Sequence, residues 1–435
     1  MQNLVSLCKR RGIIFQSSEI YGGVGATYDY GPYGVEIKNN IAKKWWSEMT
    51  LWHDNIVGLD SAILLHPKVW EASGHVQNFN DPKVDCKMCK ARFKADELST
   101  DAKGAKNCPR CGAKDSFTDI KQFNLMFKTD LGSTDETATV GYFRPETCQG
   151  IFLDYRLVQE AARLKLPFGI AQIGKAFRNE ITTGNFIFRT REFEQMEMQY
   201  FVKPNETVPA MEYWRNRRMT WYETLGVDIS KLRLSQHPPD KLAHYAKDAW
   251  DVEYEFPFGW GEIEGIHDRA DWDLSQHQKF SGKDLTIFDD EMKERYLPFI
   301  VETSAGLNRI MLMVLADAYK EDEQAGELRT YLSLHPDIAP IKAAILPLVK
   351  KDGLFEISKQ IYDDLRIKWR IFFDEGGSIG RRYRRMDEIG TPFAFTIDYQ
   401  TKEDDTVTVR WRDDLKQERL NKNQIHNFLQ SNLTK

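Results

Sequence analysis

The sequence is poor in cysteine, carries little net charge and contains no long apolar segment. Its 435 residues include six cysteines and have a formal net charge of -5. No apolar run approaches the roughly 18 residues that a membrane helix needs, and the N-terminal stretch MQNLVSLCKRRG lacks the apolar core of a secretion signal. We therefore expect a cytoplasmic protein that does not enter a membrane. The small charge also excludes a strongly basic nucleic-acid coat, although local basic patches would still bind nucleic acid.

Length and composition together indicate a globular protein of two or three domains. Hydrophobic residues make up 41% of the chain and charged residues 29%, which excludes a disordered or low-complexity protein. Aromatic residues are frequent at 12%, so the chain can bury large cores. No internal repeat is visible.

The spacing of apolar residues predicts which segments are helices and which are strands. Helical spacing is found at 35–50, 150–167, about 210–225 and 241–250. Strand patterns are found at 62–65, 123–129, 168–180, 191–202, 232–238 and 252–266. In segment 296–319 a strand pattern changes to a helical one at 302–306. The helix at 150–167 is expected to have one apolar face, formed by Leu153, Leu157, Ala161 and Leu164.

The C-terminal part of the chain has a different pattern. Segment 321–330 is polar, which is typical of a linker. Strands are expected after it at 340–349, 391–399 and 405–412, and helices at 357–373 and 423–433. The pattern predicts an α+β protein with three parts, which are a larger domain at 1–79 and 121–325, an insertion at 80–120 and a separate α/β domain at 331–435.

Four of the six cysteines form two C-x-x-C pairs, namely Cys86 with Cys89 and Cys108 with Cys111. The 18 residues between the pairs suit one tetrahedral zinc ion in a cytosolic protein better than disulfides. Segment 80–120 is rich in lysine and poor in large aliphatic residues, so a metal would have to hold it together. The alternative is a degraded ribbon with free thiols. Cys8 and Cys148 are isolated and are expected to be buried or partly buried thiols.

Arginines gather around the loop between the two long strands. Arg178 follows the first strand, while Arg189 and Arg191 lie across the 181–190 loop. Arginines on a rigid hairpin suit planar, bidentate binding of phosphate or carboxylate. Phe193 is placed to share a face with Arg191 and would stack on a purine ring. The alternative is an exposed strand pair with cross-strand ion pairs.

Carboxylates occur where apolar strands end, at Glu146, Glu194, Glu197, Glu262, Glu264 and Glu302. Such groups are expensive to bury unpaired, and an ammonium group or Mg²⁺ would satisfy them. Ion pairing with the many arginines is the alternative. Arg309 lies in the first turn of a helix, where the helix dipole disfavours a cation. That position suggests a partner outside the helix, such as a polyphosphate.

A further arginine cluster follows GSIG, with Arg381, Arg382, Arg384 and Arg385 around Tyr383. Four arginines with an aromatic residue suit contact with an RNA backbone and base stacking. A solvated helix face is the alternative.

Taken in order, these segments resemble the class II aminoacyl-tRNA synthetases, and within them the homodimeric glycyl-tRNA synthetase family. The most specific pieces are SSEIYGG, YDYGPYGVEIKNN, RPETCQGIF, FRNEI, FRTREFEQMEMQYF, FPFGWGEIEGIHDR, ETSAGLNR and GSIGRRYRRMDEIGTPF. The helix at 35–49 with the strand ending at Pro67 resembles the dimer-forming motif 1, FRNE through FEQME resembles motif 2, and ETSAGLNR resembles motif 3. The resemblance implies a six-stranded antiparallel catalytic sheet, and an anticodon-binding domain at 331–435.

The resemblance also implies a reaction and its participants. Glycine would be activated by ATP to glycyl-adenylate with the help of Mg²⁺, and the glycyl group would pass to the 3′ end of tRNA(Gly). The expected catalytic residues are Arg178 and Arg309. The expected ATP-binding residues are Arg178, Asn179, Glu180, Phe188, Arg189, Thr190, Arg191, Glu192, Phe193, Glu262, Ile263, Gly306, Leu307, Asn308 and Arg309. The expected glycine-binding residues are Glu146, Phe193, Glu194, Gln195, Met196, Glu197, Glu302, Thr303, Ser304, Ala305 and Gly306.

Individual roles follow from the same resemblance. Arg178 would hold the α-phosphate and the amino-acid carboxylate, and Phe193 would stack on adenine. Arg189 and Arg309 would reach the γ-phosphate from opposite sides. Three glutamates would hold the glycine ammonium, namely Glu146, Glu197 and Glu302. The arginine cluster at 381–385 would contact tRNA, the partner subunit would be a second copy of the chain, and Zn²⁺ in the insertion would be structural.

Two rival interpretations come from other classes of protein. A synthetase-like protein that only binds nucleic acid would be expected to lose Arg178, Glu146 or Arg309, and all three are present. A class II synthetase for serine, threonine or proline is disfavoured by RPETCQG and the three glutamates. The sequence departs from the family at His267 and Trp272, where relatives often carry smaller or different residues, and this departure does not touch the expected roles.

Overall fold

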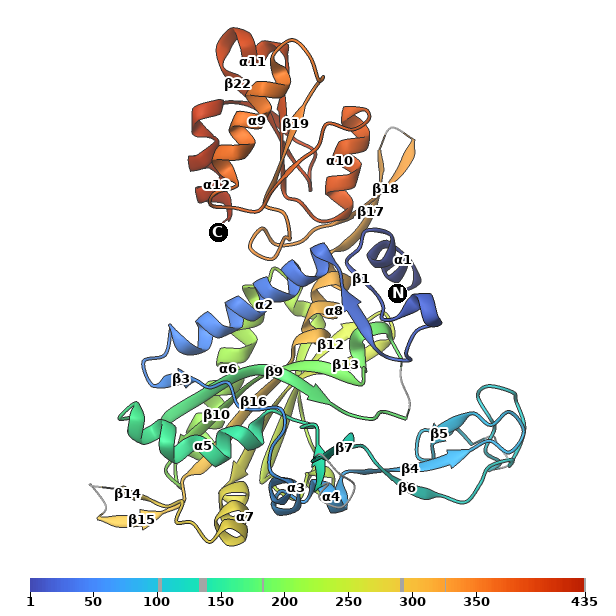
Figure 1. Cartoon of the computed structure of the whole chain (residues 1–435), viewed down its shortest axis with the longest axis vertical. Helices are drawn as coiled ribbons and strands as arrows, with labels where there is room; N and C mark the ends of the chain where they lie inside the picture. The colour runs from blue at the N-terminus through green and yellow to red at the C-terminus, as the bar shows by residue number, and fades with distance from the viewer. Residues whose placement is uncertain (101–103, 133–138, 182–183, 290–292, 325, 434–435) are drawn as a thin grey trace.

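The molecule consists of a larger body built on one sheet, a smaller C-terminal domain, and an insertion that extends away from the body (Figure 1). The computed structural model describes residues 1–100, 104–132, 139–181, 184–289, 293–324 and 326–433. Helices and strands are mixed throughout, which confirms the expected α+β class. Within the described residues, no helix combines the length and the apolar character needed to cross a membrane.

The larger body is organised around a seven-stranded sheet with the order β11-β12-β13-β16-β10-β9-β3. The strands are β3 (Ile56–Gly58), β9 (Phe168–Phe177), β10 (Glu192–Val202), β11 (Leu232–Gln236), β12 (Asp248–Phe256), β13 (Gly259–Ala270) and β16 (Phe299–Gly306). Six strands form an antiparallel series, as expected, and β3 adds a parallel strand at the edge beside β9. The predicted long hairpin is confirmed as β9 and β10.

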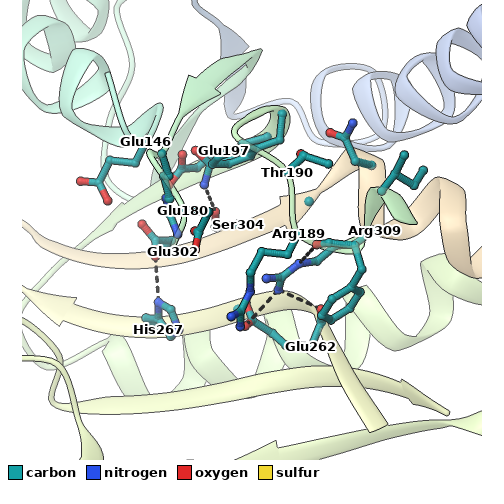
Figure 2. A pocket seen from close by; sticks show the side chains of 18 of the residues that line it. Glu146, Glu180, Arg189, Thr190, Glu197, Glu262, His267, Glu302, Ser304 and Arg309 are labelled. Carbon is teal, nitrogen blue, oxygen red and sulfur yellow. Dashed lines mark hydrogen bonds and ion pairs between the residues drawn. The ribbon is translucent and has the colours of Figure 1, made fainter. Parts of the chain in front are cut away.

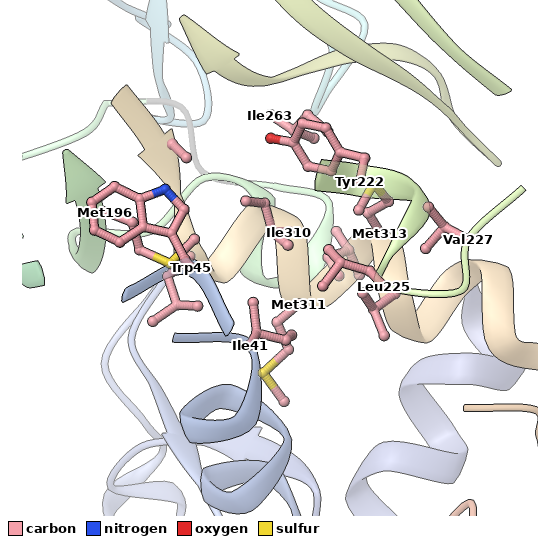
Figure 3. Packing of buried hydrophobic residues seen from close by; sticks show 14 of the residues in the cluster. Ile41, Trp45, Met196, Tyr222, Leu225, Val227, Ile263, Ile310, Met311 and Met313 are labelled. Atoms are coloured by element: carbon pink, nitrogen blue, oxygen red, sulfur yellow. The ribbon is translucent and has the colours of Figure 1, made fainter. Parts of the chain in front are cut away.

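One face of the sheet packs against three helices, namely α2 (Pro32–Thr50), α6 (Thr207–Glu223) and α8 (Leu307–Ala318). Helical spacing in the sequence explains this packing, because Ile37, Ile41 and Trp45 recur every four residues on α2 and are all fully buried. Figure 3 shows Trp45 beside Met196 of β10 and Ile41 beside Met311 of α8. The predicted change from strand to helix at 302–306 is confirmed as β16 followed by α8.

The opposite face is covered at one end by α5 (Cys148–Ala161) and α7 (Trp272–Ser281). The predicted apolar face of α5 is wrong, because Leu153 and Leu157 are 36% and 70% exposed. The buried face is formed by Ile151, Phe152 and Tyr155. The helix also ends before Leu164, since Arg163 takes a left-handed backbone conformation that stops it.

Three predicted strands are placed differently in the structure. The run 62–65 forms only an isolated bridge from Leu64 to Phe143, and the edge strand is β3, six residues earlier in the chain. Segment 123–129 divides into β6 (Lys121–Asn124) and β7 (Lys128–Leu131). The Asn124 side chain accepts from the Met126 amide at 3.0 Å and turns the chain there.

Segment 252–266 is a hairpin rather than one strand, because the chain reverses before Gly259, whose φ of +109° is left-handed. Segment 241–250 is not a helix. Only the short turn at Pro239–Lys241 is helical, and β12 already begins at Asp248. Pairing with β11 and β13 therefore overrides the local helical pattern of this segment.

The predicted linker at 321–330 is instead a hairpin of β17 (Tyr319–Gln324) and β18 (Glu327–Leu332), with residue 325 outside the described range. Its only fully buried charge is Arg329, which donates to Asp322 at 2.9 Å and to Asp387 at 3.2 Å. That ion-paired network gives the polar hairpin a fixed place between the two domains.

The C-terminal domain has a five-stranded sheet with the order β20-β19-β21-β22-β23. Its elements are β19 (Ala343–Pro347), α9 (Leu354–Leu365), β20 (Ile371–Phe373), α10 (Ile379–Glu388), β21 (Phe393–Ile397), α11 (Tyr399–Asp404), β22 (Thr406–Trp411), β23 (Gln417–Asn421) and α12 (Ile425–Leu433). The helix predicted at 357–373 ends at Leu365, because Ile371–Phe373 pairs with β19 as a strand.

The insertion is a small three-stranded sheet of β4 (Asn80–Asp85), β5 (Arg92–Lys94) and β6. Its apolar core consists of little more than Val84, Ala95 and Leu98. The remaining elements of the larger body are α1 (Gln2–Arg10), β1 (Ile14–Gln16), β2 (Tyr28–Tyr30), α3 (Pro67–Ala72), α4 (His75–Asn78), β8 (Thr139–Tyr142), β14 (Ile287–Asp289) and β15 (Glu294–Tyr296).

Candidate active site

A cavity of about 240 Å³ lies where β10 begins and β16 ends, on the face of the sheet opposite α2 and α8. Many of the predicted site residues line it, namely Glu146, Arg178, Glu180, Phe188, Arg189, Thr190, Phe193, Gln195, Glu197, Glu262, Glu302, Ser304, Gly306, Asn308 and Arg309. Figure 2 shows Arg189 and Arg309 on one side of this cavity, beside Glu262, and Glu146, Glu197 and Glu302 on the other. The site is thus strongly polarised in charge.

Five predicted site residues face the core instead, namely Met196, Ile263, Thr303, Ala305 and Leu307. Side chains on a strand alternate between its two faces, so only every second residue of β10 and β16 reaches the cavity. Phe193, Gln195 and Glu197 do so on β10. Leu307 is the first residue of α8 and is fully buried beneath it. The side chains of these five residues therefore do not line the cavity.

Four more predicted residues contact neighbouring segments rather than the cavity. Arg191 donates to the Gly25 carbonyl at 2.9 Å, and Glu194 pairs with Lys38. Glu192 pairs with Lys175, and the Asn179 amide donates to the Leu125 carbonyl at 2.7 Å. They hold the ends of β9 and β10 in place.

The basic side of the cavity contains three arginines from different elements. The guanidinium of Arg178 lies over the ring of Phe193, 5.2 Å from its centroid. Its Nε donates to the Pro145 carbonyl at 3.0 Å, and the residue lines the cavity. Arg309 donates to the Glu262 carbonyl at 2.9 Å and lies 3.1 Å from its carboxylate. The charge of Arg309 lowers the pKa of Glu262.

The acidic side is formed by Glu146, Glu197 and Glu302, whose side chains are buried or nearly so. Glu302 binds His267 at 2.8 Å and Arg269 at 3.0 Å. Burial alone would raise the pKa of Glu302, but the Arg269 charge and the His267 hydrogen bond lower it to about 2. Glu302 is therefore ionised at neutral pH.

Glu197 has a different environment from Glu302. Burial and the charges of Glu302 and Glu146 raise the pKa of Glu197 well above its usual range. It accepts a hydrogen bond from the Thr147 hydroxyl and has no basic partner in the described part of the chain. Glu146 lies 3.3 Å from His75, and this neighbour outweighs burial and lowers the pKa of Glu146 well below its usual range.

Several cavity residues were not expected from the sequence, namely Ile187, Tyr245, Gly265, His267 and Arg269. His267 was not among the predicted site residues, yet it binds Glu302 directly. Strict alternation from Ile263 would have assigned Gly265, His267 and Arg269 to the core face. The pairing of β13 with β12 shifts its register at Ile263, and this shift turns the three residues toward the cavity. Tyr245 was hidden in the segment expected to be helical, and the Arg269 guanidinium lies 3.9 Å from its ring centroid.

Glu264 belongs to a different site. It is fully buried on the helical side of the sheet, where Arg218 donates to it at 2.7 Å and Tyr222 at 2.6 Å. For this carboxylate, ordinary ion pairing is the correct interpretation.

The four cysteines of the insertion come together at its far end. The Sγ atoms of Cys86 and Cys111 are 3.7 Å apart, as are those of Cys89 and Cys108, and all four lie within 4.8 Å of one another. Two sulfurs that bind one tetrahedral zinc at about 2.3 Å are separated by roughly 3.8 Å. The donor set and its spacing therefore fit a closed zinc site. Cys8 and Cys148 are buried, as predicted.

The arginine cluster on α10 does not act as one surface. Arg382 is only 2% exposed and donates to the carbonyls of Pro347 at 2.6 Å and Leu348 at 3.3 Å. It cannot reach a tRNA phosphate, so its predicted role is wrong. Arg385 is held by Asp374 at 3.0 Å, and it lines an open groove together with Arg381 and Arg384.

Comparison with known proteins gives matches over nearly the whole chain. Residues 127–318 match the family model of the tRNA synthetase class II core domain (G, H, P, S and T), and residues 342–432 match that of the anticodon binding domain. The chain is 55% identical to a glycine–tRNA ligase of Treponema denticola over 431 residues, covering 98% of this chain and 95% of the relative. It is 51% identical to the glycine–tRNA ligase of Treponema pallidum, covering 100% of this chain and 99% of that relative. It is 53% identical to the glycine–tRNA ligase of Borreliella burgdorferi, covering 100% of this chain and 97% of that relative.

Proposed function

The chain belongs to the glycine–tRNA ligase family of class II aminoacyl-tRNA synthetases, and on this premise we propose how its cavity activates glycine with ATP and charges tRNA(Gly). One observation carries the proposal: three arginines and three buried glutamates face each other across a single small cavity. The arginines suit the phosphates of ATP and the carboxylate of the amino acid. The glutamates suit an ammonium group. An α-amino acid and a polyphosphate would thus meet between them.

In the proposed complex, Glu146, Glu197 and Glu302 hold the glycine ammonium. Arg178 holds the glycine carboxylate and the α-phosphate side by side. The carboxylate oxygen attacks the α-phosphorus in line, pyrophosphate leaves, and glycyl-adenylate forms. The chain contributes positioning and charge neutralisation, and no covalent bond to the protein is required. The terminal ribose hydroxyl of the tRNA then attacks the glycyl carbonyl, the bond from this carbonyl to the phosphate oxygen breaks, and AMP leaves.

The other arginines and Phe193 are proposed to fix the nucleotide. Arg189 and Arg309 bind the γ-phosphate, and adenine stacks on Phe193 next to Glu180. The Glu262 carboxylate lies half exposed at the cavity with a lowered pKa, so it fits as an oxygen ligand for Mg²⁺. Bound Mg²⁺ neutralises charge on phosphate oxygens.

Selectivity for glycine is proposed to be steric. Ser304 lies on β16 two residues after Glu302, opposite Glu197 of β10, and its hydroxyl accepts from Gln195 at 3.2 Å. It occupies the space into which a larger side chain would extend. Every competing amino acid is larger than glycine, so overlap rejects them without hydrolytic editing.

We further propose that the protein is a cytoplasmic homodimer with a structural zinc ion at Cys86, Cys89, Cys108 and Cys111. The dimer contact would involve α2 and the edge strand β3. Leu51 and Trp52 follow α2 directly and are 73% and 66% exposed, which supports a covered surface there. The proposed domains are a catalytic domain at 1–79 and 121–325, the insertion at 80–120 and an anticodon-binding domain at 331–435.

An ATP–pyrophosphate exchange assay with each of the twenty amino acids tests the proposal. Exchange with glycine alone, followed by charging of tRNA(Gly), is the expected result. Exchange with serine, threonine or proline would indicate a different class II synthetase. An absence of exchange with all twenty, together with retained tRNA binding, would indicate a protein that only binds nucleic acid.

A further inference from the structure

The insertion contacts the cavity through one ion pair. Oε1 of Glu97, just after β5, lies 3.1 Å from Nη1 of Arg189. In the described part of the chain, this is the only hydrogen bond of the Arg189 side chain. Glu97 is far from Arg189 in the sequence and belongs to no motif of the catalytic domain, so the sequence offers no signal for the contact.

The backbone on both sides of this ion pair is fixed. Ala95 and Leu98 flank Glu97 and are buried in the small core of the insertion. The Ala95 amide donates to the Pro82 carbonyl at 2.7 Å. On the other side, Arg189 follows Ile187, which is fully buried in the core of the larger body. Both side chains therefore extend from anchored positions.

Charge explains why Arg189 needs such a partner. Figure 2 shows Arg189 and Arg309 extending over the same part of the cavity, next to Glu262. Two guanidinium groups in one region repel each other unless carboxylates compensate them. Glu262 compensates Arg309 at 3.1 Å, and Glu97 compensates Arg189.

We propose that Glu97 is a positioning residue that holds Arg189 ready for the phosphates of ATP, so the insertion forms part of the ATP site. The inference rests on the proposed function of Arg189. The carboxylate binds Nη1 alone, which leaves Nε and Nη2 of Arg189 as donors for a phosphate. Glu97 therefore orients the guanidinium without competing for all of its donors.

Pyrophosphate-exchange kinetics on the full chain test the inference, with five variants: Glu97→Ala, Glu97→Gln, Asp96→Ala, Arg189→Ala and the double variant Glu97→Ala/Arg189→Ala. Glu97→Ala is expected to raise the KM for ATP about two- to fivefold, in the range of an exposed ion pair, and to leave the KM for glycine unchanged. Glu97→Gln should lie closer to the unmodified protein, because its amide oxygen still accepts from Arg189. The effect should shrink at high salt.

Asp96→Ala is the matched control. Asp96 is the neighbouring exposed carboxylate, and no hydrogen bond or ion pair joins it to Arg189 among the described residues. Its replacement should leave the KM for ATP unchanged, and Glu97→Ala should have no further effect once Arg189 is replaced.

Three results would overturn the inference. An unchanged KM for ATP in Glu97→Ala, with a raised one in Arg189→Ala, would remove Glu97 from the ATP site and leave the proposed function intact. A full effect of Glu97→Ala in the Arg189→Ala background would show that the change acts through the fold of the insertion. An unchanged KM for ATP in Arg189→Ala would overturn the proposed role of Arg189 and the inference with it.

Discussion

The carboxylates of Glu197 and Glu302 share one hydrogen-bond donor, the side-chain amide of Gln199, which lies 3.2 Å from the first and 2.7 Å from the second. Of these two carboxylates, only Glu302 is bound by Arg269 and His267, and Arg269 also pairs with Asp273 at 2.8 Å. Two buried carboxylates this close do not ionise independently, so the one with basic partners holds the charge and the other retains a proton. This asymmetry explains why the pKa of Glu302 is lowered to about 2 while that of Glu197 is raised.

Glycine binding is therefore expected to release a proton from Glu197. The ammonium group favours the ionised carboxylate, so the pKa of Glu197 falls on binding. At pH values below the raised pKa that Glu197 has without glycine, the affinity for glycine should increase with pH. The reason is that a smaller fraction of the protein then carries the Glu197 proton that glycine must displace. Calorimetric titration of glycine in buffers with different ionisation enthalpies measures this release directly. Identical heats in all buffers would contradict it, and Glu197→Gln should show no release.

Glu302→Gln is expected to raise the KM for glycine about ten- to hundredfold and to change that for ATP much less. The ionised carboxylate would hold the substrate ammonium, and a charge-assisted hydrogen bond of this kind contributes about 1.5–3 kcal/mol. Steady-state pyrophosphate exchange separates the two constants. A raised KM for ATP with an unchanged one for glycine would show that Glu302 does not bind the amino acid.

Arg178→Ala is expected to reduce pyrophosphate exchange at least about a hundredfold while the fold is retained. A donor that meets charge developing in the transition state contributes about 3 kcal/mol or more. Lys175→Ala is the matched control, because Lys175 lies on β9 three residues before Arg178 but is 49% exposed and pairs only with Glu192 among the described residues. Near-normal exchange in Arg178→Ala would exclude Arg178 from the mechanism.

The site was predictable as far as it follows contiguous motifs. Arg178, Glu197 and Arg309 were expected from their segments and line the cavity. The motifs did not show which residues of a strand face the cavity and which face the core. Met196 and Ala305 were therefore predicted as glycine-binding residues although they lie in the core. Glu97 could not be found, because its contact depends on how the insertion folds back toward the larger body.

The fold was predictable where local pattern and tertiary pairing agree. Helix α2 has apolar residues at helical spacing, and its end at Thr50 was expected, although it begins at Pro32, three residues before the predicted start. Segment 241–250 has a helical pattern, but its last residues pair with β11 and β13. On α5, Leu153 and Leu157 face away from the sheet and Phe152 is buried. Local periodicity alone could not show which of these two faces packs against the sheet.

Arg382→Ala is expected to destabilise the C-terminal domain rather than to weaken tRNA binding specifically. Its loss would leave buried carbonyls without a donor, at about 1–3 kcal/mol for each. Arg384→Ala, at a partly exposed position of the same helix, is the contrasting variant. It should keep the unfolding midpoint and reduce the salt dependence of tRNA binding by somewhat under one unit on a log–log plot. An unchanged slope would indicate a solvated helix face.

Cys108→Ser is expected to release one Zn²⁺ per chain and to loosen the insertion. The core of Val84, Ala95 and Leu98 is too small to hold this segment together, so the four thiolates and the metal would supply most of its stability. The lysines of the insertion suggest contact with the acceptor end of tRNA, so charging should fall more than glycine activation.

Metal analysis measures the loss of zinc, and hydrogen exchange measures the loosening of the insertion. Cys8→Ser, at a buried thiol in α1, is the control. A protein purified without chelator that contains no metal would refute the zinc site. A loss of activation that exceeds the loss of charging would instead mean that the ribbon acts mainly on the ATP site, where Glu97 meets Arg189.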